Sequence, residues 1–253
     1  MTKVNANGIS IEVESYGALD APTVLLIMGL GAQLTLWPIE LVDALVARGF
    51  RVVRYDNRDI GLSTKFDSAG IPDMPSLMMA LMGGKAPDIA YTLTDMANDA
   101  VAVLDALGIA QAHIVGASMG GMIAQLVAAN HPTRTRTLTS IMSTTGNREL
   151  PPAKPDAMAA LTGRPTTADV DAIVAFGVAA ARIVGSPAYP AEESRLTARV
   201  RADFERSFSP AGFARQMAAI VADGDRRDRN AGITAPTLVI HGDADPLVPV
   251  EGG

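Results

Sequence analysis

The sequence contains no cysteine, which excludes disulfides, thiolate metal sites and a cysteine nucleophile. It also lacks an excess of positive charge: the net charge is −6 at pH 7, the opposite of the basic surfaces that bind nucleic-acid phosphates. No apolar run approaches the roughly 20 residues that a membrane-spanning helix needs, and residues 1–8 lack a signal-peptide pattern. These absences predict a cytoplasmic protein with no nucleic-acid partner and no membrane segment.

The 253 residues are 48% hydrophobic and 19% charged, a composition typical of a globular protein. Short apolar runs of the kind that form buried strands alternate with helical patterns. This alternation predicts an α/β fold, with helices on both faces of a mostly parallel sheet. The expected strands are 23–27, 52–55, 113–115, 137–142 and 237–240, the expected helices are 38–48, 94–107 and 119–130, and residues 9–16 are expected in an antiparallel edge hairpin.

Residues 151–230 interrupt this rhythm, because they are rich in alanine and charge and lack apolar strand runs. We expect a helical cap at 151–230, between a first core segment at 1–150 and a resumed core segment at 231–253. Four methionines between residues 74 and 82 have mainly helical spacing, and they either pack into the core or face an apolar ligand. We expect Met78 and Met82, together with Trp37, to line a substrate pocket.

A nucleophile motif lies at Gly116-Ala117-Ser118-Met119-Gly120, which fits the pattern G-x-S-x-G. The motif follows an expected strand and opens an expected helix, as it does where it holds a catalytic serine. Such a tight turn forces the serine into a strained backbone conformation and needs small residues on either side. The alternative is a glycine-rich turn without chemistry, but this context favours Ser118 as a nucleophile.

Acyl chemistry at a serine also needs backbone N–H donors for the developing oxyanion, and losing one costs about 2.7–4 kcal/mol of barrier. We expect the amides of Met119 and Leu30 to be these donors. The loop around Leu30 also resembles the start of a dinucleotide fingerprint, with Gly29 and Gly31 after a strand and Asp56 ending the next strand. The third glycine of that fingerprint is replaced by Leu34, so no nicotinamide cofactor is expected, and no metal either.

An acidic turn follows the expected strand 237–240. Asp245 in this turn is the stronger candidate for a carboxylate that orients a histidine, and Asp243 is the weaker one. A solvated turn without function is the simpler alternative. Because the turn lies at the carboxyl end of its strand, we expect Asp245 at the same edge of the sheet as Ser118.

Four segments together carry a family resemblance: 27–31 with Trp37, 55–63, 116–120 and 245–249. They resemble the α/β-hydrolase superfamily, and 56–63 is most similar to bacterial esterases related to aclacinomycin methylesterase. The resemblance implies that Ser118 is the nucleophile, Asp245 the acid, and the amides of Leu30 and Met119 the oxyanion hole. It also implies cofactor-free hydrolysis of a carboxylic ester through an acyl-enzyme. The alanine and methionine content of the expected cap suggests that this ester is small and largely apolar.

The chain departs from the family pattern at two points. The family usually has histidine before the loop glycine, where this chain has Met28, although the expected donor is a later amide. Asp56, Arg58 and Ser63 are interpreted as structural residues that tie a loop near the site. The second departure concerns the base.

The family's base histidine follows one further helix and strand, but only eight residues follow Asp245 in the 253-residue chain. A crossover to another parallel strand needs about a dozen residues. We therefore expect the last strand, the last helix and the base to be absent, since His113, His131 and His241 are poorly placed to act as base. A catalytically silent binder, a C–C hydrolase or a perhydrolase remain alternatives, and a homo-oligomer is left open.

Overall fold

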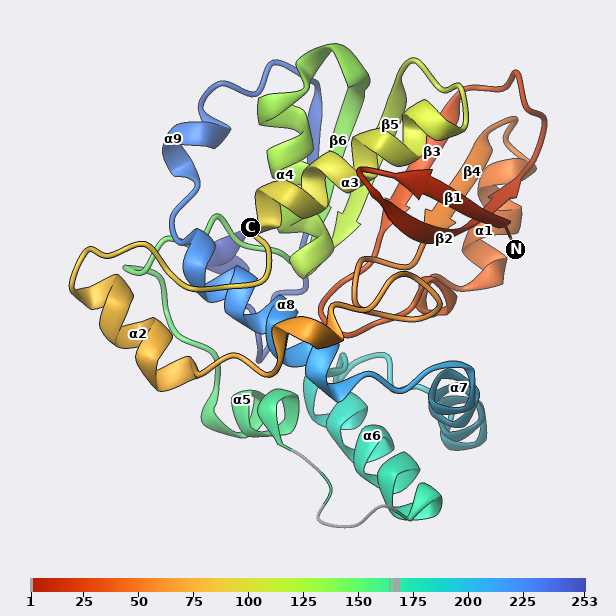
Figure 1. The fold of residues 1–253 in the computed structure, drawn as a ribbon. Coiled ribbons are helices and arrows are strands. Elements are labelled where there is room, and N and C mark those ends of the chain that lie inside the picture. The colour runs from red at the N-terminus through yellow and green to blue at the C-terminus, as the bar shows by residue number, and fades with distance from the viewer. Residues whose placement is uncertain (1, 164, 166–168) are drawn as a thin grey trace.

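The computed structural model describes residues 2–163, 165 and 169–253. Within these ranges one seven-stranded sheet has the order β1-β2-β4-β3-β5-β6-β7 (Figure 1). The pairs from β4 to β7 are parallel, which confirms the predicted α/β fold. The strands are β1 (Thr2–Ala6), β2 (Ile9–Tyr16), β3 (Thr23–Ile27), β4 (Arg51–Tyr55), β5 (Ala112–Ala117), β6 (Thr135–Ile141) and β7 (Thr237–Ile240).

Both faces of the sheet are covered, so every residue of the central strands β3 and β4 is buried. Leu25 and Ile27 point into a large apolar core on the side of α3 and α4, and Leu26 points into a smaller core on the side of α1. The helices of this half are α1 (Ile39–Val46), α2 (Met74–Met82), α3 (Leu93–Ala106) and α4 (Met119–Asn130).

The amino-terminal edge is an antiparallel hairpin, as predicted for residues 9–16. Its two-residue turn consists of Asn7 and Gly8, which both have positive φ angles, 51° and 78°. Asparagine followed by glycine favours this turn because both residues tolerate the left-handed region. The hairpin joins the parallel strands through antiparallel pairing of β2 with β4.

Between β6 and β7 the described chain is helical, as expected for 151–230. The helices are α5 (Pro155–Thr162), α6 (Val170–Val184), α7 (Glu193–Arg206), α8 (Pro210–Asp223) and α9 (Arg227–Asn230). α6 and α7 form a small core of their own around Val174 and Leu196 and lie at the bottom of Figure 1. α8 differs, because its Ala219 belongs to the large core of the sheet. The domain boundaries at 151 and 230 stay predictions.

β7 departs from the sequence prediction of a buried strand. It pairs with β6 on one side, and in the described part of the chain no strand pairs with its other side. Leu238, Val239 and Ile240 are 55%, 46% and 47% exposed. An apolar strand run thus forms an exposed sheet edge here, because no helix or strand in the described ranges covers it.

Candidate active site

Ser118 stands at the turn between β5 and α4, with a φ of 55°. Positive φ is strained for a residue other than glycine, and such residues cluster at functional sites. A Cβ added at Gly116 would lie 2.0 Å from the carbonyl oxygen of Gly120, and one at Gly120 would lie 2.1 Å from that of Ile27. The two glycines of the motif are therefore required by close backbone approach, as the sequence predicts.

β6 and the segment that follows it hold the backbone of Ser118 in this conformation. Its N–H donates to the carbonyl oxygen of Ile141 at 2.9 Å, and the hydroxyl of Ser143 donates to its carbonyl oxygen at 2.8 Å. Its side chain faces the loop after β3, since a Cβ at Gly29 would lie 3.6 Å from the serine Oγ. The hydroxyl accordingly lies between the strand–helix turn at Ser118 (the elbow) and the loop that is expected to bind the oxyanion.

The two amides expected to bind an oxyanion have no acceptor among the described residues. Met119 is the first residue of α4, where backbone N–H groups have no partner within the helix. The positive end of the helix dipole lies at the same place and favours negative charge. Leu30 is at the centre of the loop after β3. Both amides are thus free to donate to a ligand.

Side chains from distant parts of the chain hold this loop. Asn57 donates to the carbonyl oxygen of Met28 at 2.8 Å, and Asp56 accepts from the N–H of Leu34 at 2.8 Å. Gln216 of α8 accepts from the N–H of Gly31 at 2.9 Å. The loop is therefore fixed at three successive points.

Asp56 and its neighbours act as structural ties. The buried carboxylate of Asp56 also accepts from the N–H of Leu62 and pairs with Arg206, both at 2.8 Å, so it is not free to bind a ribose. Arg58 pairs with Asp99 at 2.6 Å. These contacts support a structural role for the segment and disfavour the dinucleotide alternative.

Asp245 lines the same cavity as Ser118. Its Oδ1 accepts from the N–H groups of Leu247 and Val248, both at 2.9 Å. Its Oδ2 makes no hydrogen bond in the described part of the chain and lies 3.6 Å from Nε2 of His241. Asp243 is exposed and does not line the cavity, so the structure separates the two candidates.

None of the three histidines contacts Ser118 in the described structure. His113 bonds the Thr137 hydroxyl at 2.8 Å, and His131 bonds Asn98 at 3.0 Å. Burial, together with nearby arginines, lowers the pKa of both imidazoles. His241 bonds the carbonyl oxygen of Val248 at 2.8 Å, and its Nδ1 is buried without a partner. Each of the three imidazoles is therefore held by a hydrogen bond that does not involve Ser118.

The cavity at Ser118 has a volume of about 570 Å³. Its lining is largely apolar and includes Trp37, as expected, while Arg199 and Asp245 are its charged members. Methionines from several elements contribute much of the surface. They are Met28, Met119, Met122, Met142, Met158 and Met217.

Met78 and Met82 lie outside this cavity, contrary to the sequence prediction. Met82 is 83% exposed, and Met78 is 45% exposed and lines a separate hollow. The inward residue of α2 is Leu77, which is 4% exposed. Helical spacing showed that these methionines share a helix, but not which face of that helix packs inward.

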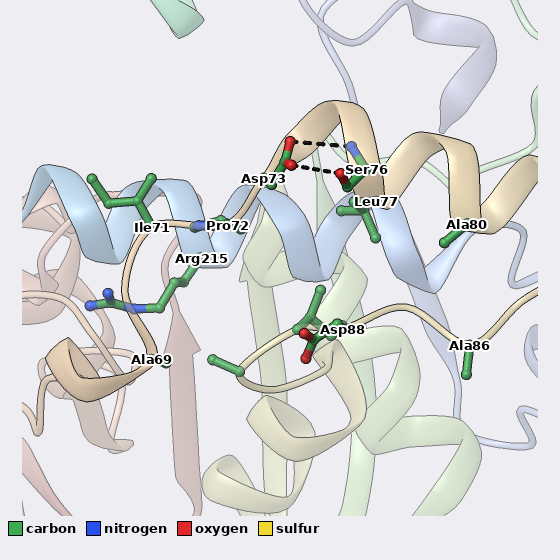
Figure 2. A pocket seen from close by; sticks show the side chains of 12 residues that line it. Ala69, Ile71, Pro72, Asp73, Ser76, Leu77, Ala80, Ala86, Asp88 and Arg215 are labelled. Atoms are coloured by element: carbon green, nitrogen blue, oxygen red, sulfur yellow. Dashed lines mark hydrogen bonds between the residues drawn. The ribbon is translucent and has the colours of Figure 1, made fainter.

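A second cavity of about 600 Å³ lies beside α2 and α8 (Figure 2). Two of its polar groups are bonded within the protein: the Ser76 hydroxyl donates to Asp73 at 2.6 Å, and Arg215 pairs with Asp59 at 2.7 Å. Asp88, which also lines it, is exposed. The cavity therefore offers no activated nucleophile. In the described residues no cluster of metal ligands is present, and no helix is long and apolar enough to cross a membrane.

The family follows from comparison with known sequences, because the profile of the alpha/beta hydrolase fold matches residues 22–253. The chain belongs to the α/β-hydrolase fold family. This confirms the resemblance seen in the sequence, and the elbow at Ser118 occupies the position at which the family motif is expected.

Individual relatives agree with this family. Rhodomycin D methylesterase DauP of Streptomyces sp. (strain C5) is 40% identical over 123 residues, which are 49% of this chain and 35% of that protein. RutD of Variovorax paradoxus (strain S110), an inferred carbamate hydrolase, is 30% identical over 94% of this chain and 80% of its own length. The match thus spans about a third of the methylesterase.

Solved structures give the same fold. The enol-lactonase of Burkholderia xenovorans LB400 superimposes with a TM-score of 0.73 at 25% identity, covering 99% of this chain and 85% of the other. An esterase from Exiguobacterium antarcticum gives a TM-score of 0.72 at 24% identity and similar coverage, 99% and 84%.

Proposed function

We propose that the protein is a serine hydrolase that cleaves a carboxylic ester through an acyl-enzyme at Ser118. One observation carries the proposal: a serine with positive φ opens onto an apolar cavity of about 570 Å³ that it shares with Asp245. The free amides of Leu30 and Met119 flank it. Methylesterase, carbamate hydrolase and lactonase relatives support hydrolysis of an acyl bond.

In the proposed reaction the Ser118 oxygen attacks the ester carbonyl carbon while a general base takes the hydroxyl proton; by the family resemblance this base would be a histidine imidazole. The carbonyl oxygen becomes an oxyanion that accepts from the N–H groups of Leu30 and Met119. Collapse of this intermediate expels the alcohol, which receives the proton, and water then releases the acid by the same steps. Asp245 orients the base and stabilises its charged form.

None of the three histidines serves as that base in this proposal. His113 and His131 are engaged away from the site, and His241 follows β7, which β6 separates from the strand of Ser118. Neighbouring strands lie about 4.8 Å apart, so two spacings separate the strands of His241 and Ser118. Covalent capture of Ser118 is therefore a better measurement than steady turnover.

The apolar lining favours a small, largely apolar ester, with the methionine side chains adapting to its shape.

A cytoplasmic location and a homo-oligomer stay predictions from the sequence. C–C bond hydrolysis and perhydrolysis use similar serine sites and are tested with the corresponding substrates.

Labelling with a fluorophosphonate tests the proposal. The chain should be labelled at Ser118, the Ser118→Ala variant should not be labelled, and His241→Ala should be labelled at the wild-type rate. A burst of p-nitrophenol from an activated ester provides a second measurement. A wild-type chain that gives neither label nor burst would favour the silent binder, and loss of labelling in His241→Ala would overturn the exclusion of His241 as the base.

A further inference from the structure

We infer that Gln216 of α8 is a positioning residue for the oxyanion hole, an inference that rests on the proposed function of Ser118. Gln216 is 0% exposed and lies within the helical segment between β6 and β7. It is 185 residues away from Gly31 in the sequence. Its side chain does not touch the expected reacting atoms. It acts on the loop that presents Leu30.

Both ends of the Gln216 amide are used. Its Oε1 accepts from the N–H of Gly31 at 2.9 Å, and its Nε2 donates to the carbonyl oxygen of Arg58 at 2.8 Å. A buried amide bonded at both ends has one orientation, because turning it over would leave two buried groups unsatisfied. Gln216 therefore links the loop after β3, which contains Leu30 and Gly31 (the oxyanion loop), to the loop after β4, which contains Arg58 and Asp59 (the structural loop).

The bond to Gly31 falls on the central peptide of a turn in this loop. The N–H of Ala32 donates to the carbonyl oxygen of Gly29 at 3.3 Å, so Leu30 and Gly31 are the central residues of a β-turn. Gly31 has a φ of 68°, as at the third position of a type II turn. Type I and type II turns differ by rotation of the central peptide, whose N–H belongs to Gly31. Gln216 holds that N–H and so prevents the rotation.

Of the two amides at the centre of the turn, the bond occupies that of Gly31 and leaves that of Leu30 available to a ligand. With the N–H of Gly31 bonded to Gln216, the N–H of Leu30 is left without an acceptor among the described residues. Preorganised donors stabilise an oxyanion because they need not reorient during the reaction. The ring of Phe213, one turn earlier on α8, also packs against Gly31, since a Cβ there would lie 2.5 Å from it.

The position of α8 is thereby coupled to the reactivity of Ser118. Next to Gln216, Arg215 binds Asp59 through two bonds of 2.8 and 2.7 Å, which anchors the helix to the structural loop. The same helix contributes Met217 to the wall of the cavity. A ligand that displaces α8 would disturb the oxyanion hole as well as the pocket.

The test compares Gln216→Leu, which removes both bonds at similar volume, with Gln216→Glu, which keeps an acceptor for Gly31. We expect the fluorophosphonate labelling rate and the burst rate to fall about 10- to 100-fold in Gln216→Leu, less than the 10²–10³ for loss of a donor. The concentration of ester giving half the maximal burst rate should change little. Gln216→Glu should recover part of the rate, because its carboxylate accepts from Gly31 but cannot donate to the carbonyl oxygen of Arg58. Ala218→Gly on the same helix is the control for lost stability, since it costs about 1 kcal/mol without contacting the loop.

Amide hydrogen exchange of Gly31 provides a measurement that does not depend on reactivity. Its N–H should be protected in the wild type and in Gln216→Glu, and should exchange faster in Gln216→Leu. A wild-type chain without labelling overturns the proposed function and the positioning role with it, even if Gly31 is protected. A reactive wild type whose rate is unchanged in Gln216→Leu, or falls equally in Ala218→Gly, overturns the positioning role alone.

Discussion

The reactive serine depends on two glycines that have no chemistry of their own. At Gly116 and Gly120, the space for a side chain is filled by backbone atoms, which cannot move aside as a flexible side chain can. Hydrogen bonds with β6 and with the segment after it then hold Ser118 at positive φ. The strain at one residue is thus maintained by close packing around it.

The Gly120→Ala variant tests this packing. The added Cβ would meet the carbonyl oxygen of Ile27 at 2.1 Å, so we expect a loss of about 1–3 kcal/mol in the free energy of unfolding or more. Urea unfolding measures this loss, and labelling of Ser118 should fall with it. In the control Gly232→Ala the nearest atom is 3.5 Å away, an ordinary contact, and little change is expected. Equal stability of the two variants would contradict the close approach.

Among the elements, α8 contributes to the core, to the cavity and to the structural loop. It packs on the large core through Ala219, lines the cavity with Met217 and binds the structural loop through Arg215. The Arg215–Asp59 pair is 2.7 Å long, with side chains 2% and 0% exposed. Burial by itself would raise the pKa of Asp59, but hydrogen bonds from Arg215 and from the N–H of Phe66 outweigh it and lower the pKa.

We expect Asp59→Asn to cost about 3–5 kcal/mol near neutral pH, because it leaves the buried Arg215 cation without its partner. The folded-state pKa of Asp59 is lowered, so its stabilisation is present above the ordinary value of 3.8 and is lost as pH falls through the lowered pKa. The difference between wild type and variant should therefore shrink in acid. Denaturant unfolding at a series of pH values measures it.

Asp67→Asn is the matched control for this pair. Asp67 also contacts Arg215, at 3.3 Å, but its side chain is 78% exposed. Exposed ion pairs contribute about 0–1 kcal/mol, so this variant should remain near wild-type stability at every pH. A loss in Asp59→Asn that does not vary with pH would argue against a role for the charge.

For the whole molecule, the exposed edge at β7 is the most conspicuous departure from a closed surface. Its three apolar side chains lie at one end of the sheet, together with backbone groups that pair with no strand of the described ranges. An exposed apolar edge strand is a template for pairing with another chain. The other end of the sheet is the short β1–β2 hairpin.

We expect the chain to self-associate through this edge in a concentration-dependent manner. Val239→Lys should weaken the association about tenfold or more, equivalent to ~1.4 kcal/mol, because a charged side chain disfavours edge pairing. Sedimentation velocity across a concentration series measures the effect. Val250→Lys is the control, since Val250 is 40% exposed but lies outside the strand. A wild type that stays monomeric, or equal association of both variants, would contradict the role of the edge.

The sequence alone indicated the strands from β2 onward, the presence of an edge hairpin, and the turn at Ser118 with its glycines, but it did not place β1. These features depend on local chemistry: β-branched runs favour strands, and a tight strand–helix turn requires small residues next to the serine. Asp245 was also indicated locally, since the carboxyl ends of parallel strands meet at one edge. The resemblance to the family rested on the same short motifs.

Only the tertiary structure decided which side chains surround the serine. Helical spacing pointed to Met78 and Met82, but the six methionines of the cavity come from five separate segments of the chain, with two of them on α4. The tie between Gln216 and Gly31 joins residues 185 positions apart, and the exposure of β7 depends on what lies beside it. The spacing of apolar residues shows which residues share a face of a helix or strand. What that face contacts depends on the packing of segments that are distant in the sequence.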